Sequence, residues 1–207
     1  MNYRIKPLLI LLAVLLNSIS ASGTLKEGDK FFPFSLIGVD QKIVTAAMEE
    51  GRLVVMTEYM EGGEKITSKT YPDSILIDFW ATWCVPCRAA MPSMQKLYDQ
   101  YVPKEGQEQG GLGLFGIALD TQGSKIVKPF YEKLKFTYPM LCDPTEGSDD
   151  VDLIRSTKKM KSLYKVQGIP VVYLIDSEGI IRHVHVGFKE KDFEKLDSLI
   201  KTMTAGD

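Results

Sequence analysis

The sequence predicts an α/β fold in which a central mixed β-sheet is flanked by helices. Two observations lead to this expectation. From residue 74 onward, apolar runs of strand length alternate with segments of helical periodicity. The chain then closes with two short strands joined by a turn, followed by an amphipathic helix at residues 191–203. Such alternation is typical of layered α/β domains. The 207 residues, of which 44% are hydrophobic, suffice for one domain with a sizeable core.

The N-terminus has the features of an export signal. Two basic residues precede a leucine-rich run at residues 8–16, and small residues follow it. Positive charge, a short apolar run and small residues are the three regions of a secretory signal. The alternative is a retained membrane anchor at residues 8–20, but this run is short against the ~20 residues of a bilayer span. We therefore expect a signal peptide at residues 1–22, a folded domain at residues 23–207, and a periplasmic or otherwise extracytoplasmic location.

The first part of the domain predicts an N-terminal β extension. Residues 25–45 form an apolar segment interrupted by a turn, and residues 46–51 predict a short helix or turn. Two runs rich in β-branched residues lie on either side of Glu-Gly-Gly-Glu at residues 61–64. They predict a β-hairpin inserted at about residues 52–72. We expect this hairpin to be a solvent-exposed elaboration, with partner contacts along its edge strands as the alternative.

The later elements follow from the period of the apolar residues. Residues 74–80 are largely apolar and predict a strand that is buried on both faces. The elements expected after it are helices at residues 88–101, 124–134, 150–164 and 191–203, and strands at residues 114–119, 138–142, 171–175 and 180–186. Helices and strands thus alternate up to the closing hairpin.

A C-x-x-C motif, Cys84-Val85-Pro86-Cys87, follows the buried strand directly and precedes a helix. Cys84 is therefore expected at a helix N-terminus, where unpaired backbone N–H groups and the helix dipole favour a thiolate. Pro86 suits the first turn of the helix because no N–H is needed there. Since the thiolate is the attacking species in disulfide exchange, the motif predicts a redox-active Cys84–Cys87 pair.

These residues resemble a known family. The sequence FWATWCVPC at residues 79–87, together with Arg88 and Pro92, is similar to the TlpA, ResA and CcmG type of exported thiol–disulfide oxidoreductase in the thioredoxin superfamily. Gly-Ile-Pro at residues 168–170 stands where that superfamily has its cis-proline. By the order of its elements the resemblance covers residues 25–203, and it implies a thioredoxin-like fold.

The resemblance also implies a mechanism, in which Cys84 attacks a protein disulfide and Cys87 resolves the mixed disulfide. The substrate-binding residues that it implies are Trp83, Val85, Pro86, Ile169 and Pro170. For Pro170 the alternative is that it only starts the following strand. The implied partners are protein thiols and disulfides, with apocytochrome c in cytochrome c biogenesis as a candidate, and a membrane thiol carrier as electron donor. No cofactor is expected beyond the redox-active disulfide.

Asp78 is the third candidate for catalysis. Many of these reductases have glutamate where this chain has Ala90, and often asparagine where it has Asp78. Asp78 instead matches the buried aspartate of thioredoxins themselves. Desolvation in an apolar strand should raise the pKa of this carboxyl group, which could then accept the proton of Cys87. The alternative is an aspartate at a strand end, bonded to backbone.

Composition and spacing exclude other classes of function. The net charge of −2 supplies no electrostatic reason to expect a nucleic-acid partner. A zinc site needs more ligands than the C-x-x-C pair, and Cys142, His183 and His185 form no second close pair, so no metal site is predicted. The two histidines are expected on an exposed strand face. Cys142 is expected to be a buried core thiol.

Two other functions stay open. A peroxiredoxin-like thiol peroxidase would share the fold, but its usual P-x-x-x-T-x-x-C motif has threonine where this chain has Ala81. A non-catalytic binding module on a thioredoxin fold is the second alternative, against which the intact C-x-x-C motif argues. The motif alone does not decide the direction of the redox reaction. Val85-Pro86 and the family resemblance favour reduction.

Overall fold

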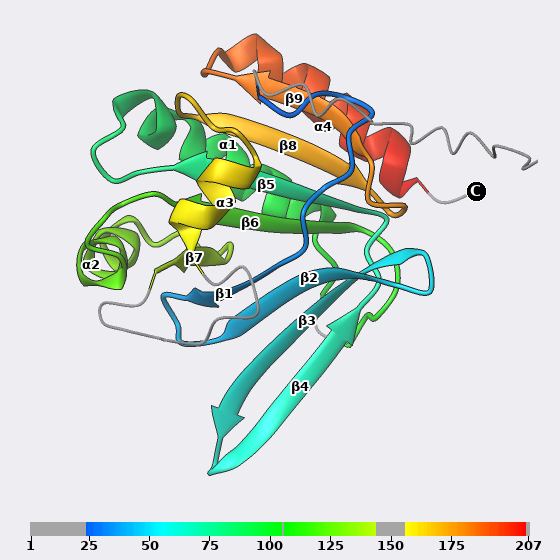
Figure 1. The fold of residues 1–207 in the computed structure, drawn as a ribbon, viewed down its shortest axis with the longest axis vertical. Coiled ribbons are helices and arrows are strands. Elements are labelled where there is room, and N and C mark those ends of the chain that lie inside the picture. The colour runs from blue at the N-terminus through cyan, green and yellow to red at the C-terminus, as the bar shows by residue number, and fades with distance from the viewer. Residues whose placement is uncertain (1–23, 105, 144–155, 206–207) are drawn as a thin grey trace, which may run out of the picture.

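The computed structural model describes residues 24–104, 106–143 and 156–205, built around a nine-stranded sheet with helices on both faces (Figure 1). The strands are β1 Phe34–Gly38, β2 Ile43–Glu49, β3 Arg52–Glu61, β4 Glu64–Thr70, β5 Ser74–Trp80, β6 Leu112–Ala118, β7 Met140–Cys142, β8 Val171–Asp176 and β9 Ile181–Val186. The helices are α1 Val85–Tyr101, α2 Ser124–Leu134, α3 Thr157–Leu163 and α4 Glu190–Thr204. In these ranges no helix is long and apolar enough to span a bilayer.

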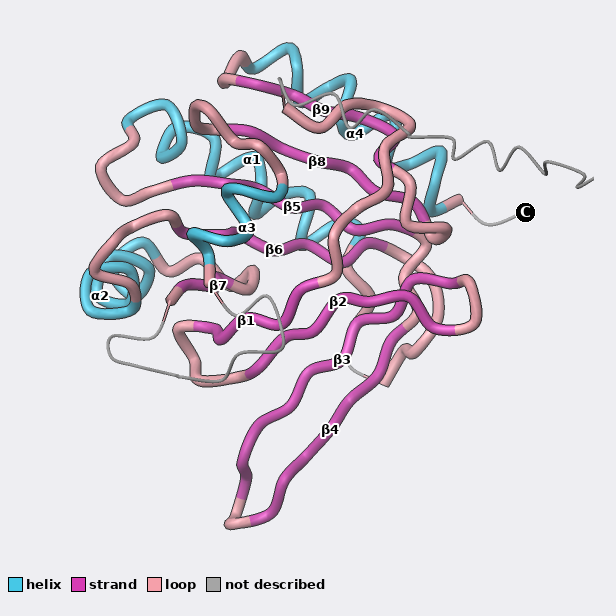
Figure 2. Tube along the Cα trace, viewed as in Figure 1, coloured by secondary structure: helices cyan, strands magenta, loops and turns pink. Residues whose placement is uncertain are grey.

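The strands lie in the order β4-β3-β2-β1-β7-β6-β5-β8-β9 (Figure 2). The pairs β5·β6 and β6·β7 are parallel, and the other neighbouring pairs are antiparallel. The sheet is therefore mixed, as predicted. Strand β5 lies between β6 and β8, and all seven of its residues are buried. This confirms the prediction of a strand that is covered on both faces.

The N-terminal extension consists of strands throughout. The hairpin β3–β4 is confirmed, with Gly62 and Gly63 at positive φ in its turn, and its far end projects from the body of the domain (Figure 1). The prediction of a helix or turn at residues 46–51 is wrong, because β2 continues to Glu49 and only Glu50 and Gly51 form the turn. The Ala-Ala-Met stretch at residues 46–48 favours helix by propensity, but pairing of all three residues with β3, and of Ala46 also with β1, overrides it.

Helix α3 starts later than its sequence pattern predicted. Ser156 has an extended backbone, and its side chain accepts a hydrogen bond from the backbone N–H of Lys159 at 3.4 Å. This arrangement is an N-cap, so the helix begins at Thr157. The rest of the predicted segment, residues 150–155, lies outside the described residues.

Alternate residues of β5 face opposite sides of the sheet and enter two different core clusters. Ile77 and Phe79 pack with the N-terminal strands and α3, whereas Leu76 and Trp80 pack with buried residues of α1, α2 and α4. Asp78 lies between Leu76 and Trp80 on that second face. The strand pattern therefore places a carboxyl group under the helix that carries the cysteines.

Gly116 of β6 pairs with Asp78 of β5, and its missing side chain leaves room for three neighbours. A Cβ atom at this glycine would lie 2.5 Å from Met140 Sδ, 3.2 Å from Trp80 Nε1 and 3.3 Å from Tyr138 Cε2. All three side chains are buried, so none can move into solvent. Glycine is required here for close packing.

We expect Gly116→Ala to lower the free energy of unfolding by about 1–3 kcal/mol, because it overpacks a filled core. Urea denaturation measures this difference. Gly168→Ala is the control, since a Cβ there would meet nothing within 4 Å and its φ is not positive. The control should be neutral or slightly stabilising. Equal losses in the two variants would contradict the packing argument.

Candidate active site

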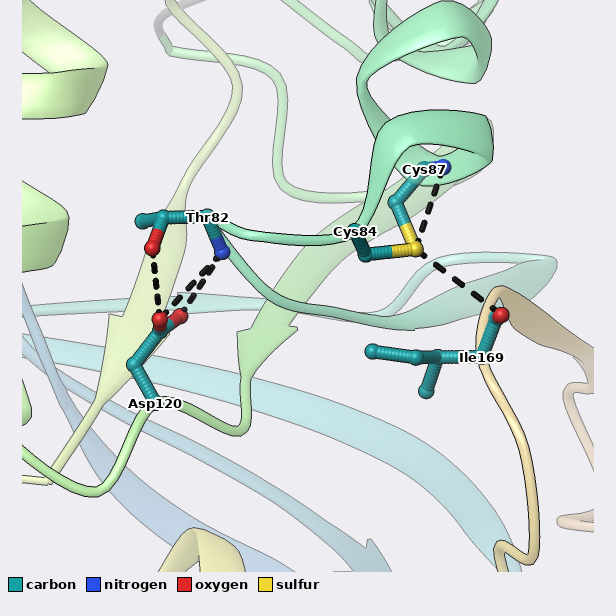
Figure 3. The surroundings of a disulfide bond; sticks show 5 residues. All are labelled: Thr82, Cys84, Cys87, Asp120 and Ile169. Carbon is teal, nitrogen blue, oxygen red and sulfur yellow. Dashed lines mark hydrogen bonds between the residues drawn. A yellow bond between two sulfur atoms is a disulfide. The ribbon is translucent and has the colours of Figure 1, made fainter.

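Cys84 and Cys87 form a disulfide at the start of α1. Cys84 is the N-cap residue, and its Sγ accepts a hydrogen bond from the backbone N–H of Cys87 at 3.2 Å (Figure 3). Pro86 occupies the second helical position, where its missing N–H breaks no helical hydrogen bond. The predicted position of Cys84 at a helix N-terminus is therefore confirmed.

Apolar side chains flank the disulfide at the surface. Trp83 is 68% exposed and Val85 is 65% exposed, whereas Cys84 is 4% exposed and Cys87 is 1% exposed. Two large apolar groups are thus exposed next to a nearly buried disulfide. Trp80, by contrast, is fully buried and packs against the ring of Phe130. The two tryptophans of the motif therefore differ in role, one at the surface and one in the core.

The Ile169–Pro170 peptide bond is cis, and its loop lies beside the cysteines. The Ile169 carbonyl oxygen is 3.8 Å from Cys84 Sγ, although the two residues are 85 positions apart (Figure 3). A disulfide sulfur carries no proton, so this is a contact in the oxidised form. In the dithiol form the Cys84 S–H can donate to the same oxygen. The structure thus brings together the two segments that the sequence singled out.

Two residues beside the site were not identified from the sequence. Val186 is 62% exposed at the end of β9 and pairs with Val171, the residue that follows the cis-proline. Asp120 is 2% exposed, follows β6, and binds Thr82 in the loop before Cys84. The sequence feature that could have identified Asp120 is its place as an acidic residue just after a buried parallel strand. No sequence feature identified Val186, because its exposure follows from the position of β9 at the edge of the sheet.

The backbone N–H of Thr82 donates to Asp120 Oδ2 at 3.0 Å and to Oδ1 at 3.3 Å. The Thr82 hydroxyl donates to Oδ1 at 2.6 Å. Figure 3 shows this carboxylate facing Thr82 on the side away from the cysteines. Both oxygens of this buried carboxyl group are thus satisfied by one residue, as buried polar groups require.

Asp78 is in a different situation. It is 1% exposed and lies within β5, and its Oδ1 has no hydrogen-bond partner among the described residues. Desolvation raises the pKa of its carboxyl group to about 7. The alternative of a strand-end aspartate bonded to backbone is therefore wrong. Among the described residues, the hydroxyl of Tyr138 is also buried without a hydrogen-bond partner. Its pKa is raised first by burial and then by the charge of Asp78.

The remaining cysteine and histidines lie apart from this chemistry. Cys142 is buried, as expected, and burial raises its pKa to about 12, with further contributions from Asp143 and Asp120. The prediction of an exposed face for His183 and His185 is wrong, because His183 is 7% exposed and the side chain of His185 only 22%.

Segments on either side cover the two histidines. His183 Nδ1 lies 3.1 Å from Glu27 Oε1 in the N-terminal segment, and His185 Nε2 lies 3.4 Å from Asp192 Oδ2 on α4. Within the described ranges, no group of three or more His, Cys, Asp or Glu side chains is arranged to hold a metal ion.

Comparison with known proteins agrees with this geometry. The AhpC/TSA family model matches residues 28–184. The chain is 27% identical over 186 residues to the thiol-disulfide oxidoreductase ResA of Oceanobacillus iheyensis, covering 89% of this chain and 80% of that protein. It is 30% identical over 144 residues to ResA of Bacillus cereus, covering 69% of this chain and 70% of that protein. It is 32% identical over 127 residues to the thioredoxin-like protein YneN of Bacillus subtilis, covering 59% of this chain and 63% of that protein.

Solved structures support the fold. The thioredoxin domain of a thiol-disulfide oxidoreductase from Bacteroides vulgatus superposes with a TM-score of 0.59 at 18% identity, covering 86% of this chain and 99% of that one. A thiol:disulfide interchange protein from Bacteroides sp. superposes with a TM-score of 0.54 at 19% identity, covering 88% and 92%. The fold is therefore thioredoxin-like, as predicted.

The raised pKa of Asp78 links stability to pH. The folded state holds its proton up to about pH 7, whereas the unfolded chain loses it near pH 4. Between about pH 4 and pH 7 the folded state therefore binds more protons, so its stability falls as the pH rises across this window and levels off above it. We expect Asp78→Asn to remove this loss, so that the variant gains up to about 4 kcal/mol on the wild type between pH 4 and pH 8. Urea denaturation at several pH values measures the gain, and a constant difference would contradict the raised pKa.

Proposed function

Because this chain belongs to the AhpC/TSA family and is a TlpA/ResA-like thiol–disulfide oxidoreductase of the thioredoxin superfamily, we propose that it reduces disulfide bonds of exported proteins through Cys84 and Cys87. The observation that carries this proposal is the disulfide at the N-terminus of α1, with Cys84 Sγ beside the cis-proline loop. An attacking sulfur, a helix N-terminus and an adjacent loop for the substrate chain meet at one point.

In the first step, the Cys84 thiolate attacks one sulfur of a substrate disulfide. A mixed disulfide forms, the substrate S–S bond breaks, and the second substrate sulfur leaves as a thiolate that takes up a proton. The helix N-terminus stabilises the negative charge of Cys84 before the attack. Trp83, Val85 and Pro86 would contact the substrate on one side of the disulfide, and Ile169 and Pro170 on the other.

In the second step, Cys87 gives its proton to Asp78 and attacks Cys84 Sγ. The mixed disulfide breaks, the reduced substrate leaves, and the Cys84–Cys87 disulfide forms, which is the state seen in the structure. Asp78 suits this task because a carboxyl group with a pKa of about 7 accepts a proton at neutral pH and releases it again. Its place in β5 puts it on the face of the sheet that α1 covers.

Regeneration of the dithiol needs two electrons and two protons from an external dithiol, for which a membrane thiol carrier is the proposed donor. The proposed location is extracytoplasmic, on the strength of the signal-like residues 1–22, which lie outside the described residues. Apocytochrome c is the candidate substrate class. No cofactor takes part in the proposed cycle beyond the Cys84–Cys87 disulfide.

The two alternative functions have less support. A peroxidatic site would use a threonine hydroxyl three residues before its cysteine, and Ala81 at that position has no hydroxyl group. A binding module without catalysis would not require a cysteine pair at a helix N-terminus beside a cis-proline loop.

We expect the purified protein to catalyse insulin reduction by dithiothreitol. Cys84→Ser should abolish this activity, because the attacking thiolate is lost. Cys87→Ser should instead accumulate mixed disulfides, because attack continues without resolution. The control Cys142→Ser should remain active, since Cys142 is buried. An inactive wild type, or activity that survives Cys84→Ser, would refute the proposal. An equilibrium potential near that of the strong oxidants, about −120 mV, would refute the reductive direction.

We expect Asp78→Asn to slow the resolution step by about a hundredfold, a typical contribution of a positioned general base. Rapid acid quenching of the mixed disulfide measures this step. The first attack should be unaffected. In the wild type, resolution should speed up as the pH rises through about 7 and Asp78 ionises, and the variant should lose this inflection. Unchanged turnover across pH 6–9 would remove Asp78 from the mechanism.

A further inference from the structure

The loop between β5 and α1 is a tight turn whose two central residues face opposite ways. The N–H of Cys84 donates to the Ala81 carbonyl at 3.1 Å, so Ala81–Cys84 is a β-turn with Thr82 and Trp83 at its centre. Trp83 is 68% exposed, whereas Thr82 is bound to the buried Asp120. The conformation of this turn decides where Cys84 stands relative to the first N–H groups of α1.

Asp120 is well placed to fix the turn. The N–H of Leu119 donates to the Trp80 carbonyl at 2.8 Å, which extends the pairing of β5 and β6 to the residue before Asp120. The N–H of Gly123 donates to the Asp120 carbonyl at 3.0 Å and closes the next turn. The carboxylate is thus held by the backbone on both sides, and it accepts both the N–H and the hydroxyl of Thr82.

We propose that Asp120 is a positioning residue that, through Thr82, holds the Ala81–Cys84 turn in the conformation that presents Cys84 Sγ to the N-terminus of α1. The inference rests on the proposed function, since it concerns the reactivity of the same sulfur. Both Thr82 donors bond to a carboxyl group that is 2% exposed, and hydrogen bonds shielded from water are electrostatically stronger than exposed ones. If the turn loosens, Cys84 Sγ loses its place opposite the Cys87 N–H, and the thiolate loses its stabilisation.

The two buried aspartates near the cysteines therefore act in different ways. Asp78 has an oxygen without a partner and exchanges a proton in the proposed cycle. Asp120 has both oxygens occupied and acts through geometry. Variants of Thr82 or Asp120 should accordingly change the reactivity of Cys84 itself, whereas variants of Asp78 should change the step that Cys87 performs.

The primary test compares Thr82→Val with Thr82→Ser in the reduced protein. Valine keeps the shape but removes the hydroxyl donor, and serine keeps the donor. Iodoacetamide labelling of Cys84, followed by mass spectrometry across pH 5–9, reports the pKa of its thiol. For Thr82→Val we expect a midpoint about one unit higher and a roughly tenfold slower labelling at mildly acidic pH. Thr82→Ser should stay within about twofold of the wild type.

Thermal unfolding and Asp120→Asn complete the test. Asparagine can accept from the Thr82 N–H and donate to its hydroxyl oxygen, so it keeps both hydrogen bonds to Thr82 with a side chain that cannot ionise. A shift of the Cys84 pKa in Asp120→Asn that is smaller than the shift in Thr82→Val supports the positioning role of Asp120. If Thr82→Val loses thermal stability but the pH profile of Cys84 labelling is unchanged, the Asp120–Thr82 contact is purely structural and the proposal is overturned. Equal shifts of the Cys84 pKa in Thr82→Ser and Thr82→Val would also overturn it. If the wild type fails to reduce insulin but the valine variant shows the expected shift, the proposed function fails while the positioning role stands.

Discussion

The contact on which the rest of the site depends is the hydrogen bond from the Cys87 N–H to Cys84 Sγ at the first turn of α1. It places one sulfur where the unpaired N–H groups of a helix converge, and it holds the second sulfur within bonding reach. Helix α1 can begin there only because β5 ends at Trp80 and a four-residue turn connects the two elements. The position of the sulfur is thus a consequence of strand and helix ends rather than of the cysteines alone.

The sheet supplies the other parts of the site through its order. Strand β5 lies between β6 and β8, so the residue after β6 and the residues before β8 both reach the cysteine loop. Asp120 contacts Thr82 on one side of the cysteine loop, and the Ile169–Pro170 loop contacts Cys84 on the other (Figure 3). These contacts join segments 38 and 85 residues apart in the chain. A parallel pair next to an antiparallel pair is what allows one end of β6 and the opposite end of β8 to meet at the same edge.

Local patterns foretold much of this arrangement. The buried strand β5, the hairpin β3–β4 and the position of Cys84 follow from apolar runs, turn residues and the C-x-x-C spacing. The path of β2 does not, since its Ala-Ala-Met stretch suits a helix and becomes a strand only by pairing with β3 and, at Ala46, with β1. Asp120 was not identified, and the prediction for His183 was wrong, for the same reason. Their surroundings come from distant segments: Thr82 in one case, and Glu27 with the N-terminal segment in the other.

The contrast between Asp78 and Asp120 shows why residue type alone does not assign a role. Both side chains are almost fully buried; Asp78 lies within β5, and Asp120 follows the adjacent strand β6. Around Asp120, the N–H and hydroxyl of Thr82 compensate the lost hydration. Around Asp78, the facing glycine at position 116 brings Trp80 and Tyr138 close, yet their polar atoms form no bond to it among the described residues. The Asp78 carboxyl group, without such compensation, has a pKa raised to about 7 and can exchange a proton. The Asp120 carboxyl group has both oxygens bonded to Thr82 and holds that residue in place.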